Sequence, residues 1–256
     1  YGIDASWESS LRKFVKKIMV IDDLADRRHD CDILLDQNYG RKGSRYNGLI
    51  PEHCIQLLGP EYALLRPQFR EARENLRERG GGVKKILVFM GGADPADETG
   101  KVLQALKMLN RDDVAVDVVI GASNPFKNEI ETMVKQMPNT ACYFNVSNMA
   151  ELMASADIGI GASGTSTWER CCIGLPSIVM ILADNQKHIA EELDKEGALI
   201  NLGWHENVTE RDIKDAVEKL LKDSASRKMM GLKGKKMVDG MGVKKIVEKI
   251  IFLNGK

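Results

Sequence analysis

The sequence has no excess of either charge. Lys and Arg together number 37, and Asp and Glu together also number 37. Proteins that bind nucleic acid or an anionic membrane surface through electrostatics carry a clustered positive excess. We therefore expect neither nucleic acid nor a membrane among the partners of this chain.

Long apolar runs are also absent. No run reaches the roughly 18 residues of a membrane-spanning helix. The opening letters YGIDASWES lack the basic start and apolar stretch of a secretory signal. The chain does not begin with Met and opens inside what reads as a strand-to-helix turn. We therefore expect a fragment of a cytoplasmic protein.

Cysteine spacing typical of a metal site is missing. The number of cysteines is odd, and no CxxC pair occurs. Acidic residues are scattered and form no cluster of the kind that binds Mg²⁺ or Zn²⁺. We expect no metal site, and we interpret the cysteines in apolar runs as small core residues in a reducing compartment.

Apolar runs alternate with amphipathic segments from about residue 85 onward. The strand candidates are KKILVFM, VAVDVVIGA, TACYFN, DIGIGA, LPSIVMIL and ALINLG. Helical patterns separate them, which predicts a parallel sheet with helices on both faces, the doubly wound α/β arrangement. After Glu206 the pattern changes to helices only, the first of them capped by Asn207 or Thr209.

The first 80 residues read differently. KKIMVIDD, CDILLDQN and CIQLLGP predict strands with almost no helix between them, which makes a poor stand-alone domain. We interpret residues 1–66 as the back half of an N-terminal α/β domain whose front half is missing. Residues 67–83 then form a charged linker helix that ends in glycines. Residues 84–256 form the C-terminal domain with its terminal helices.

Two glycines follow the first strand of the predicted C-terminal sheet. Gly91, Gly92 and Asp94 lie between that strand and a helix. Ligands gather beyond the carboxyl ends of parallel strands, and the start of the next helix presents unpaired N–H groups to a phosphate. A glycine pair in such a turn also occurs for reasons of backbone geometry alone. Both interpretations stay open.

The stretch GASGTSTWERCCIGLP is the strongest candidate. Ser163, Gly164, Thr165 and Ser166 fall where a helix begins just past a buried strand. Their N–H and hydroxyl groups would surround a phosphate at the positive end of the helix dipole. Glu169 lies about one turn further on, where a carboxylate suits the adjacent hydroxyls of a ribose. The alternative is a simple cap, with Thr165 or Ser166 at the N-cap and Glu169 in the first turn.

A third group follows the strand LPSIVMIL. Asn185 and Gln186 open the next helix and offer amide groups of the kind that read sugar hydroxyls or acetamido groups. The alternative is that Asp184 or Asn185 only caps this helix.

The four histidines offer no clear catalytic base. We expect His29 and His53 on the surface and His205 in an inert position near a late turn. His188 follows Asp184 by one helical turn and is a candidate ligand contact.

The motifs together resemble a known family. They are GGADP, NMAELMASADIGIGASGTSTWERCCIGLPSIVMILADNQ, IDDLADRRHDCDILLDQNYG and LLGPEYALLRPQF. The chain resembles, over nearly its whole length, the UDP-2,4-diacetamido-2,4,6-trideoxy-β-L-altropyranose hydrolase family of pseudaminic acid biosynthesis and its spore-coat polysaccharide relatives. This resemblance implies a two-domain GT-B-like fold, a UDP-sugar substrate held mainly by the C-terminal domain, and no metal or other cofactor.

The resemblance also assigns roles to residues by position. It places the glycine motifs near the diphosphate, Glu169 at the uridine ribose, and Asn185 and Tyr1 close to the sugar. The nucleotide-binding set is Gly91, Gly92, Asp94, Gly164, Thr165, Ser166 and Glu169, and the sugar-binding set is Tyr1, Asn185 and Gln186.

One departure from the family affects the expected activity. The family's general base is a His in a G-x-G-H-x-x-R motif, which activates water for attack at the anomeric carbon with loss of UDP. This chain has no such motif, so we expect it to bind UDP-sugar weakly and not to turn it over. The alternatives are a GT-B glycosyltransferase and a non-catalytic nucleotide-sugar-binding module. A dinucleotide oxidoreductase is disfavoured because no G-x-G-x-x-G follows a strand.

Overall fold

The computed structural model describes residues 2–40, 43–77, 79 and 81–254. The chain divides into two compact units. The first combines Tyr1–Arg66 with Val238–Lys256, and the second is Pro67–Met237.

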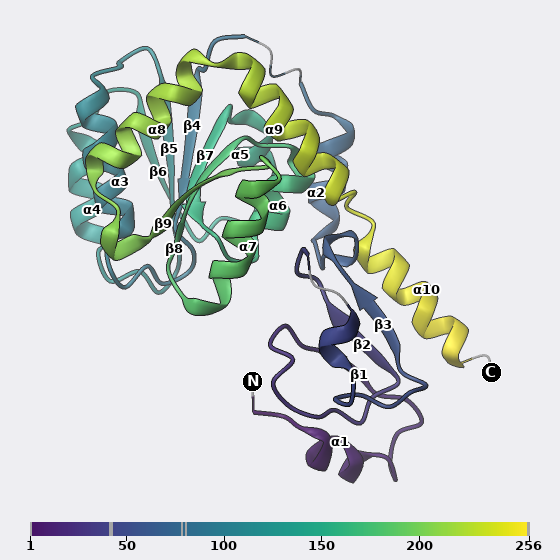
Figure 1. The fold of residues 1–256 in the computed structure, drawn as a ribbon. Coiled ribbons are helices and arrows are strands. Elements are labelled where there is room, and N and C mark those ends of the chain that lie inside the picture. Colours follow the sequence, from purple (N-terminus) through teal and green to yellow (C-terminus); the bar gives the residue numbers. More distant parts are fainter. Residues whose placement is uncertain (1, 41–42, 78, 80, 255–256) are drawn as a thin grey trace. The chain divides into compact units, whose positions relative to one another are not determined.

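The second unit is built on a six-stranded parallel sheet in the order β6-β5-β4-β7-β8-β9 (Figure 1). The expected parallel α/β fold is confirmed. The strand order reverses beside β4, and ligands of open α/β sheets bind at such a reversal. The strands are β4 (Lys85–Phe89), β5 (Ala115–Ile120), β6 (Thr140–Phe144), β7 (Ile158–Ala162), β8 (Ser177–Ile181) and β9 (Ile200–Trp204).

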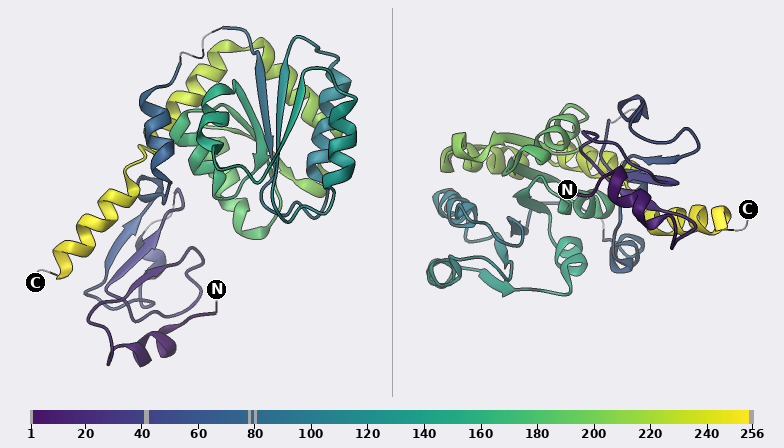
Figure 2. Two further views of the ribbon diagram at one scale, coloured as in Figure 1. Left: turned by 180° about the vertical axis from the view of Figure 1, so that it is seen from behind. Right: turned by 90° about the horizontal axis from the view of Figure 1, so that it is seen from below.

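Helices cover both faces of this sheet (Figure 2). They are α2 (Pro67–Glu74), α3 (Glu98–Leu109), α4 (Lys127–Lys135), α5 (Met149–Ser155), α6 (Ser166–Ile173), α7 (Asp184–Lys195), α8 (Glu210–Lys222) and α9 (Ser224–Met237), with a 3₁₀ turn η3 (His205–Asn207). Of the two caps expected for the helix after Glu206, Thr209 is the one observed, in a capping box with Asp212.

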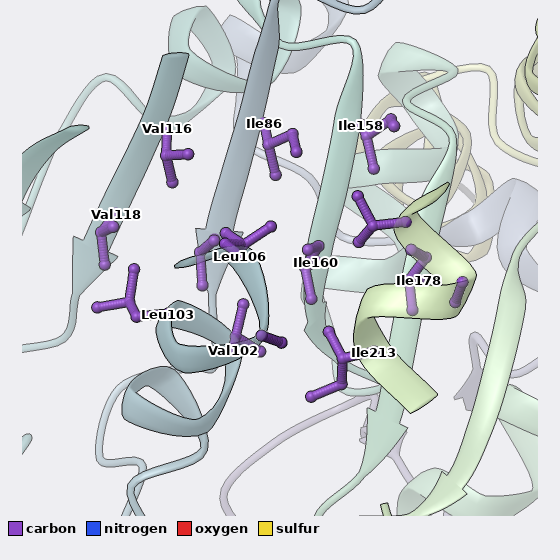
Figure 3. Close-up of a cluster of buried hydrophobic side chains, with 14 of the residues drawn as sticks. Ile86, Val102, Leu103, Leu106, Val116, Val118, Ile158, Ile160, Ile178 and Ile213 are labelled. Atoms are coloured by element: carbon purple, nitrogen blue, oxygen red, sulfur yellow. The ribbon is translucent and has the colours of Figure 1, made fainter. Parts of the chain in front are cut away.

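Alternate strand residues form the main core. Ile86, Ile158 and Ile178, from three different strands, point to the same face of the sheet, where they meet Leu106 of α3 and Ile213 of α8 (Figure 3). All five side chains are buried. Because successive side chains of a strand point to opposite faces, the intervening strand residues face the other layer of helices.

The first unit contains a three-stranded parallel sheet in the order β1-β2-β3. The expected strands appear as β1 (Met19–Ile21), β2 (Ile33–Asp36) and β3 (Ile55–Leu58). The remaining elements are α1 (Ala5–Leu11), two 3₁₀ turns, η1 (Gly43–Tyr46) and η2 (Pro60–Tyr62), and the last helix, α10 (Gly242–Asn254).

The last helix differs from the expectation for residues 84–256. We assigned residues 238–256 to the C-terminal domain, but this segment belongs to the first unit. Ile246 and Ile250 of α10 pack in one cluster with Leu35 and Leu57 of the small sheet. This sheet has no other helix of comparable length to cover its apolar face in the described part of the unit.

The expected linker helix also packs as part of a unit. α2 belongs to the second unit, where Phe69 is fully buried. Arg73 Nη1 donates a hydrogen bond of 2.8 Å to the carbonyl of Cys172, at the end of α6.

The prediction of a surface position for His29 is wrong. Its side chain is 1% exposed, and its Nδ1 lies 2.7 Å from Glu8 Oε1. The other oxygen of Glu8 accepts a hydrogen bond of 2.6 Å from the Asp30 N–H, so one buried acid fixes the loop at two points. The polar loop looked solvent-exposed because Glu8, the partner that makes burial tolerable, is distant in sequence.

This pair gives the first prediction. Glu8→Ala should lower the free energy of unfolding by about 2–4 kcal/mol, because it leaves a buried imidazole and a backbone N–H without their acceptor. Urea denaturation measures the change. Glu52→Ala, at an exposed position of the same unit, is the control and should change stability by less than about 0.5 kcal/mol. Equal effects of the two substitutions would contradict a structural role for Glu8.

Candidate functional site

The loops after β4, β7 and β8 lie together at the carboxyl edge of the larger sheet. Phe89 of β4 pairs with Gly161 of β7, and Ala162 of β7 pairs with Met180 of β8. The N–H of Ser163 then donates to the Met180 carbonyl at 3.1 Å. The three sequence motifs therefore begin at the same edge of the sheet.

The start of α3, after β4, is already occupied by acidic side chains. Asp94 is buried and accepts hydrogen bonds from the N–H groups of Glu98 at 2.9 Å and Thr99 at 3.0 Å. Asp97 accepts a further one from Gly100 at 3.1 Å. The expectation that this helix presents unpaired N–H groups to a phosphate is wrong, because carboxylates take that place.

The glycine pair before α3 serves backbone geometry. Gly91 has a φ of 103°, which favours glycine. Gly92 lies against Gly121 so closely that a Cβ on Gly121 would come within 2.2 Å of the Gly92 carbonyl oxygen. That oxygen also accepts a hydrogen bond of 3.1 Å from the Ser123 N–H. The loops after β4 and β5 are thus joined through these glycines.

The start of α6, after β7, is open. Thr165 occupies the N-cap position, but no side chain caps the helix. Within the described part of the chain, the N–H groups of Gly164, Thr165 and Ser166 make no hydrogen bond. Ser163 is fully buried, and its hydroxyl has no partner among the described residues. The alternative of a simple side-chain cap at this helix is therefore not observed.

Glu169 lies one turn into α6 and is half-buried. It is four residues beyond Thr165, which places the two residues on the same side of the helix. Thr165 is exposed, whereas Gly164 and Ser166 are half-buried. The open N–H groups and one carboxylate thus belong to the same first two turns.

The loop after β8 approaches the start of α6 through Gln186. Its Oε1 accepts a hydrogen bond of 3.1 Å from the Leu182 N–H, and its Nε2 would lie 3.6 Å from a Cβ on Gly164. Asn185 is exposed. Ala183 is the N-cap of α7 and makes no side-chain cap, so neither Asp184 nor Asn185 is positioned as the helix cap.

The other expected residues take different positions. Tyr1 lies outside the described residues. His188 Nε2 is buried without a partner in the described chain. His205 Nδ1 lies 2.8 Å from Glu98 Oε1, which joins the end of β9 to α3. His53 is exposed, as expected, with 62% of its side chain accessible.

One buried cation in this region was not expected from the sequence. Arg170, one residue after Glu169, is 3% exposed and hydrogen-bonds inside the turn between β7 and α6. The signal in the sequence was the pattern of Gly159 and Gly161 on a buried strand, since small residues there leave space for a side chain from the covering helix.

The described residues contain no group of three or more His, Cys, Asp or Glu side chains that could hold a metal ion. Among the helices in the described parts of the chain, none combines the length and apolar character needed to cross a membrane.

Comparison with known protein families shows which family this chain belongs to. Residues 86–249 match the family model "Glycosyltransferase family 28 C-terminal domain". The chain belongs to this family. The match spans the six-stranded sheet with its open helix start at α6.

Individual relatives agree with this assignment. The chain is 30% identical over 186 residues to the spore coat polysaccharide biosynthesis protein SpsG of Bacillus subtilis, covering 72% of this chain and 55% of SpsG. It is 28% identical over 199 residues to the UDP-2,4-diacetamido-2,4,6-trideoxy-beta-L-altropyranose hydrolase of Campylobacter jejuni, covering 77% and 69%. The chain thus spans only about half the length of SpsG.

Solved structures confirm the GT-B-like fold. The crystal structure of Acinetobacter baumannii MurG superposes with a TM-score of 0.65 at 14% identity, covering 96% of this chain and 70% of MurG. A UDP-GlcNAc 2-epimerase from Neisseria meningitidis gives a TM-score of 0.54 at 16% identity, covering 72% of this chain and 48% of that one.

The contrast between two glycines gives the second prediction. Gly121→Ala should lower the free energy of unfolding by about 2–3 kcal/mol, because its Cβ would overlap backbone atoms that cannot move aside. Gly164→Ala should change it by less than about 1 kcal/mol, since the nearest atom to its Cβ is a side-chain nitrogen at 3.6 Å. Urea denaturation of both variants tests this, and an equal loss at the two positions would contradict it.

Proposed function

We propose that this chain binds the UDP part of a UDP-sugar at the carboxyl edge of its six-stranded sheet. The observation that carries the proposal is the contrast between two helix starts. Acidic side chains close the start of α3, whereas the start of α6 has no side-chain cap. An anion placed between these loops is repelled by the first and attracted by the second.

The diphosphate would lie against the start of α6. The N–H groups of Gly164, Thr165 and Ser166 would donate to its oxygens, and the hydroxyls of Thr165 and Ser166 would add further donors. Glu169 would accept hydrogen bonds from the 2′ and 3′ hydroxyls of the ribose. In this proposal Gly91, Gly92 and Asp94 shape the neighbouring loop without donating to the phosphates.

The sugar would extend toward the loop after β8. Asn185 is exposed, so its amide is accessible to a ligand. Gln186 Nε2 is close to Gly164 and could donate to the sugar or to the phosphate next to it. Tyr1 stays a sugar-binding prediction that follows from the resemblance.

At the level of the whole protein we propose hydrolysis of the UDP-sugar. Support comes from the similarity to the UDP-2,4-diacetamido-2,4,6-trideoxy-beta-L-altropyranose hydrolase of Campylobacter jejuni. Water would attack the anomeric carbon, the bond from that carbon to the diphosphate oxygen would break, and UDP would leave with the bonding electron pair. The N–H groups of α6 would stabilise the negative charge that develops on the leaving diphosphate. The base that deprotonates the water would come from outside these 256 residues.

A glycosyltransferase is the second candidate. The family description favours it, and the proposed UDP site would serve either reaction. The two differ in what attacks the anomeric carbon. A sugar product joined to water supports hydrolysis, and one joined to an acceptor supports transfer.

The ribose contact gives the third prediction. Glu169→Ala should weaken UDP binding about 10- to 100-fold, because hydrogen bonds to a charged acceptor are worth roughly 1.5–3 kcal/mol. Isothermal titration calorimetry measures the affinity. Glu71→Ala, at an exposed position on α2, is the control and should leave affinity unchanged. If Glu169→Ala also leaves it unchanged, the proposed position of the ribose is wrong.

The missing base gives the fourth prediction. The isolated 256-residue chain should release no UDP from a UDP-sugar above the uncatalysed rate, because its sequence contains no Gly-x-Gly-His turn. A coupled assay for UDP release tests this. Binding without turnover fits the proposal, and restored turnover on adding a separate N-terminal polypeptide would identify the source of the base. Rapid release by the chain alone would overturn this assignment.

A further inference from the structure

Arg170 lies inside the turn that connects β7 to α6. Its Nη2 donates to the carbonyl of Ala162 at 2.8 Å and to the Thr167 hydroxyl at 3.0 Å, and its Nη1 donates to the Ser166 hydroxyl at 3.1 Å. The residue is 3% exposed. The guanidinium therefore joins the last residue of the strand to the first turn of the helix, on either side of the candidate diphosphate loop.

The strand leaves space for this side chain. A Cβ on Gly161 would lie 2.9 Å from Arg170 Nη1 and 2.5 Å from the Phe89 carbonyl oxygen. A Cβ on Gly159 would lie 3.2 Å from Arg170 Cδ. Two positions of a fully buried strand are thus glycine where the arginine crosses it.

The electrostatic position of Arg170 is unusual. A helix start carries partial positive charge, so a cation there is unfavourable. Burial lowers the pKa of the guanidinium to about 10, which still leaves it charged at neutral pH. Within the described chain Arg170 forms no ion pair, although the charge of Glu169 favours its protonated form. Its Nε has no hydrogen-bond partner there either.

Two other arginines of the same unit show the ordinary arrangement. Arg79 donates to the carbonyls of Met153 and Ala154 at the end of α5 and of Ile173 at the end of α6. Arg227 donates to carbonyls at the end of α8 and to that of Gly81. A cation at a helix end is stabilised by the dipole. Arg170 itself lies in the last turn of α6, but its guanidinium reaches back to groups at the positive start of that helix, whereas the other two guanidinium groups bind carbonyls at helix ends.

We infer that Arg170 is a positioning residue that prepares the start of α6 to hold a diphosphate. It fixes the turn through its hydrogen bonds and adds a buried positive charge to the turn that carries the open N–H groups. A fixed charge in a water-poor site attracts an anion more strongly than an exposed one does. The inference rests on the proposed UDP site and adds to it that the site selects for the charged diphosphate over the nucleoside.

The test compares UDP with uridine, which lacks the phosphates. In the unaltered chain, calorimetry should show UDP binding at least about tenfold more tightly than uridine. Arg170→Gln should reduce this preference by about tenfold or more, while uridine affinity changes by less than about threefold. Arg170→Lys, which keeps a cation, should retain most of the preference.

A matched control separates this role from general stability. Arg227→Gln also removes a buried guanidinium that donates to carbonyls, so it should destabilise the chain but leave the preference for UDP over uridine unchanged. Thermal unfolding of every variant measures the stability change. The inference is overturned if Arg170→Gln keeps the preference, or if Arg170→Lys loses it as fully as Arg170→Gln does.

If the Arg170→Gln variant does not fold, the binding of UDP and uridine to the unaltered chain still provides a test. Uridine binding without a preference for UDP would overturn the inference while leaving nucleoside binding in place. No binding of either compound would instead refute the proposed function.

Discussion

Backbone N–H groups at a helix start need an acceptor, and the two helices that follow the neighbouring strands β4 and β7 meet this need differently. At α3 the carboxylates of Asp94 and Asp97 accept hydrogen bonds from the first-turn N–H groups. At α6 no side chain does so. Since both helices begin at the same edge of the sheet, an anion there is attracted more strongly by the start of α6 than by the start of α3. The candidate site depends on this asymmetry.

Other features of the turn between β7 and α6 are consistent with a binding site for an anion. Arg170 adds a cation where the helix dipole makes one unfavourable, and Gly159 and Gly161 give it the space to lie there. Ser163 is buried with an unpartnered hydroxyl in the described chain. Unfavourable local arrangements of this kind concentrate at functional sites, where a ligand offsets their cost.

The regular part of the fold could be predicted from the sequence. Apolar runs with helical segments between them give a parallel sheet, because only that arrangement buries both faces of every strand. The unit to which the last helix, α10, belongs could not be predicted, because its apolar residues fit either unit. Its cluster with Leu35 and Leu57 forms through contacts distant in sequence. His29 was misjudged for the same reason, as Glu8 lies 21 residues away.

The sequence by itself determined the fold class and which loops gather at the sheet edge, because strand periodicity and the parallel connection rule are local properties of the chain. Only the tertiary structure decided which helix start is open. A glycine-containing loop precedes both α3 and α6, but whether a nearby carboxylate turns back onto the first-turn N–H groups depends on backbone dihedrals such as the φ of 45° at Asp94. Those dihedrals are set by packing between neighbouring loops, which no local pattern records.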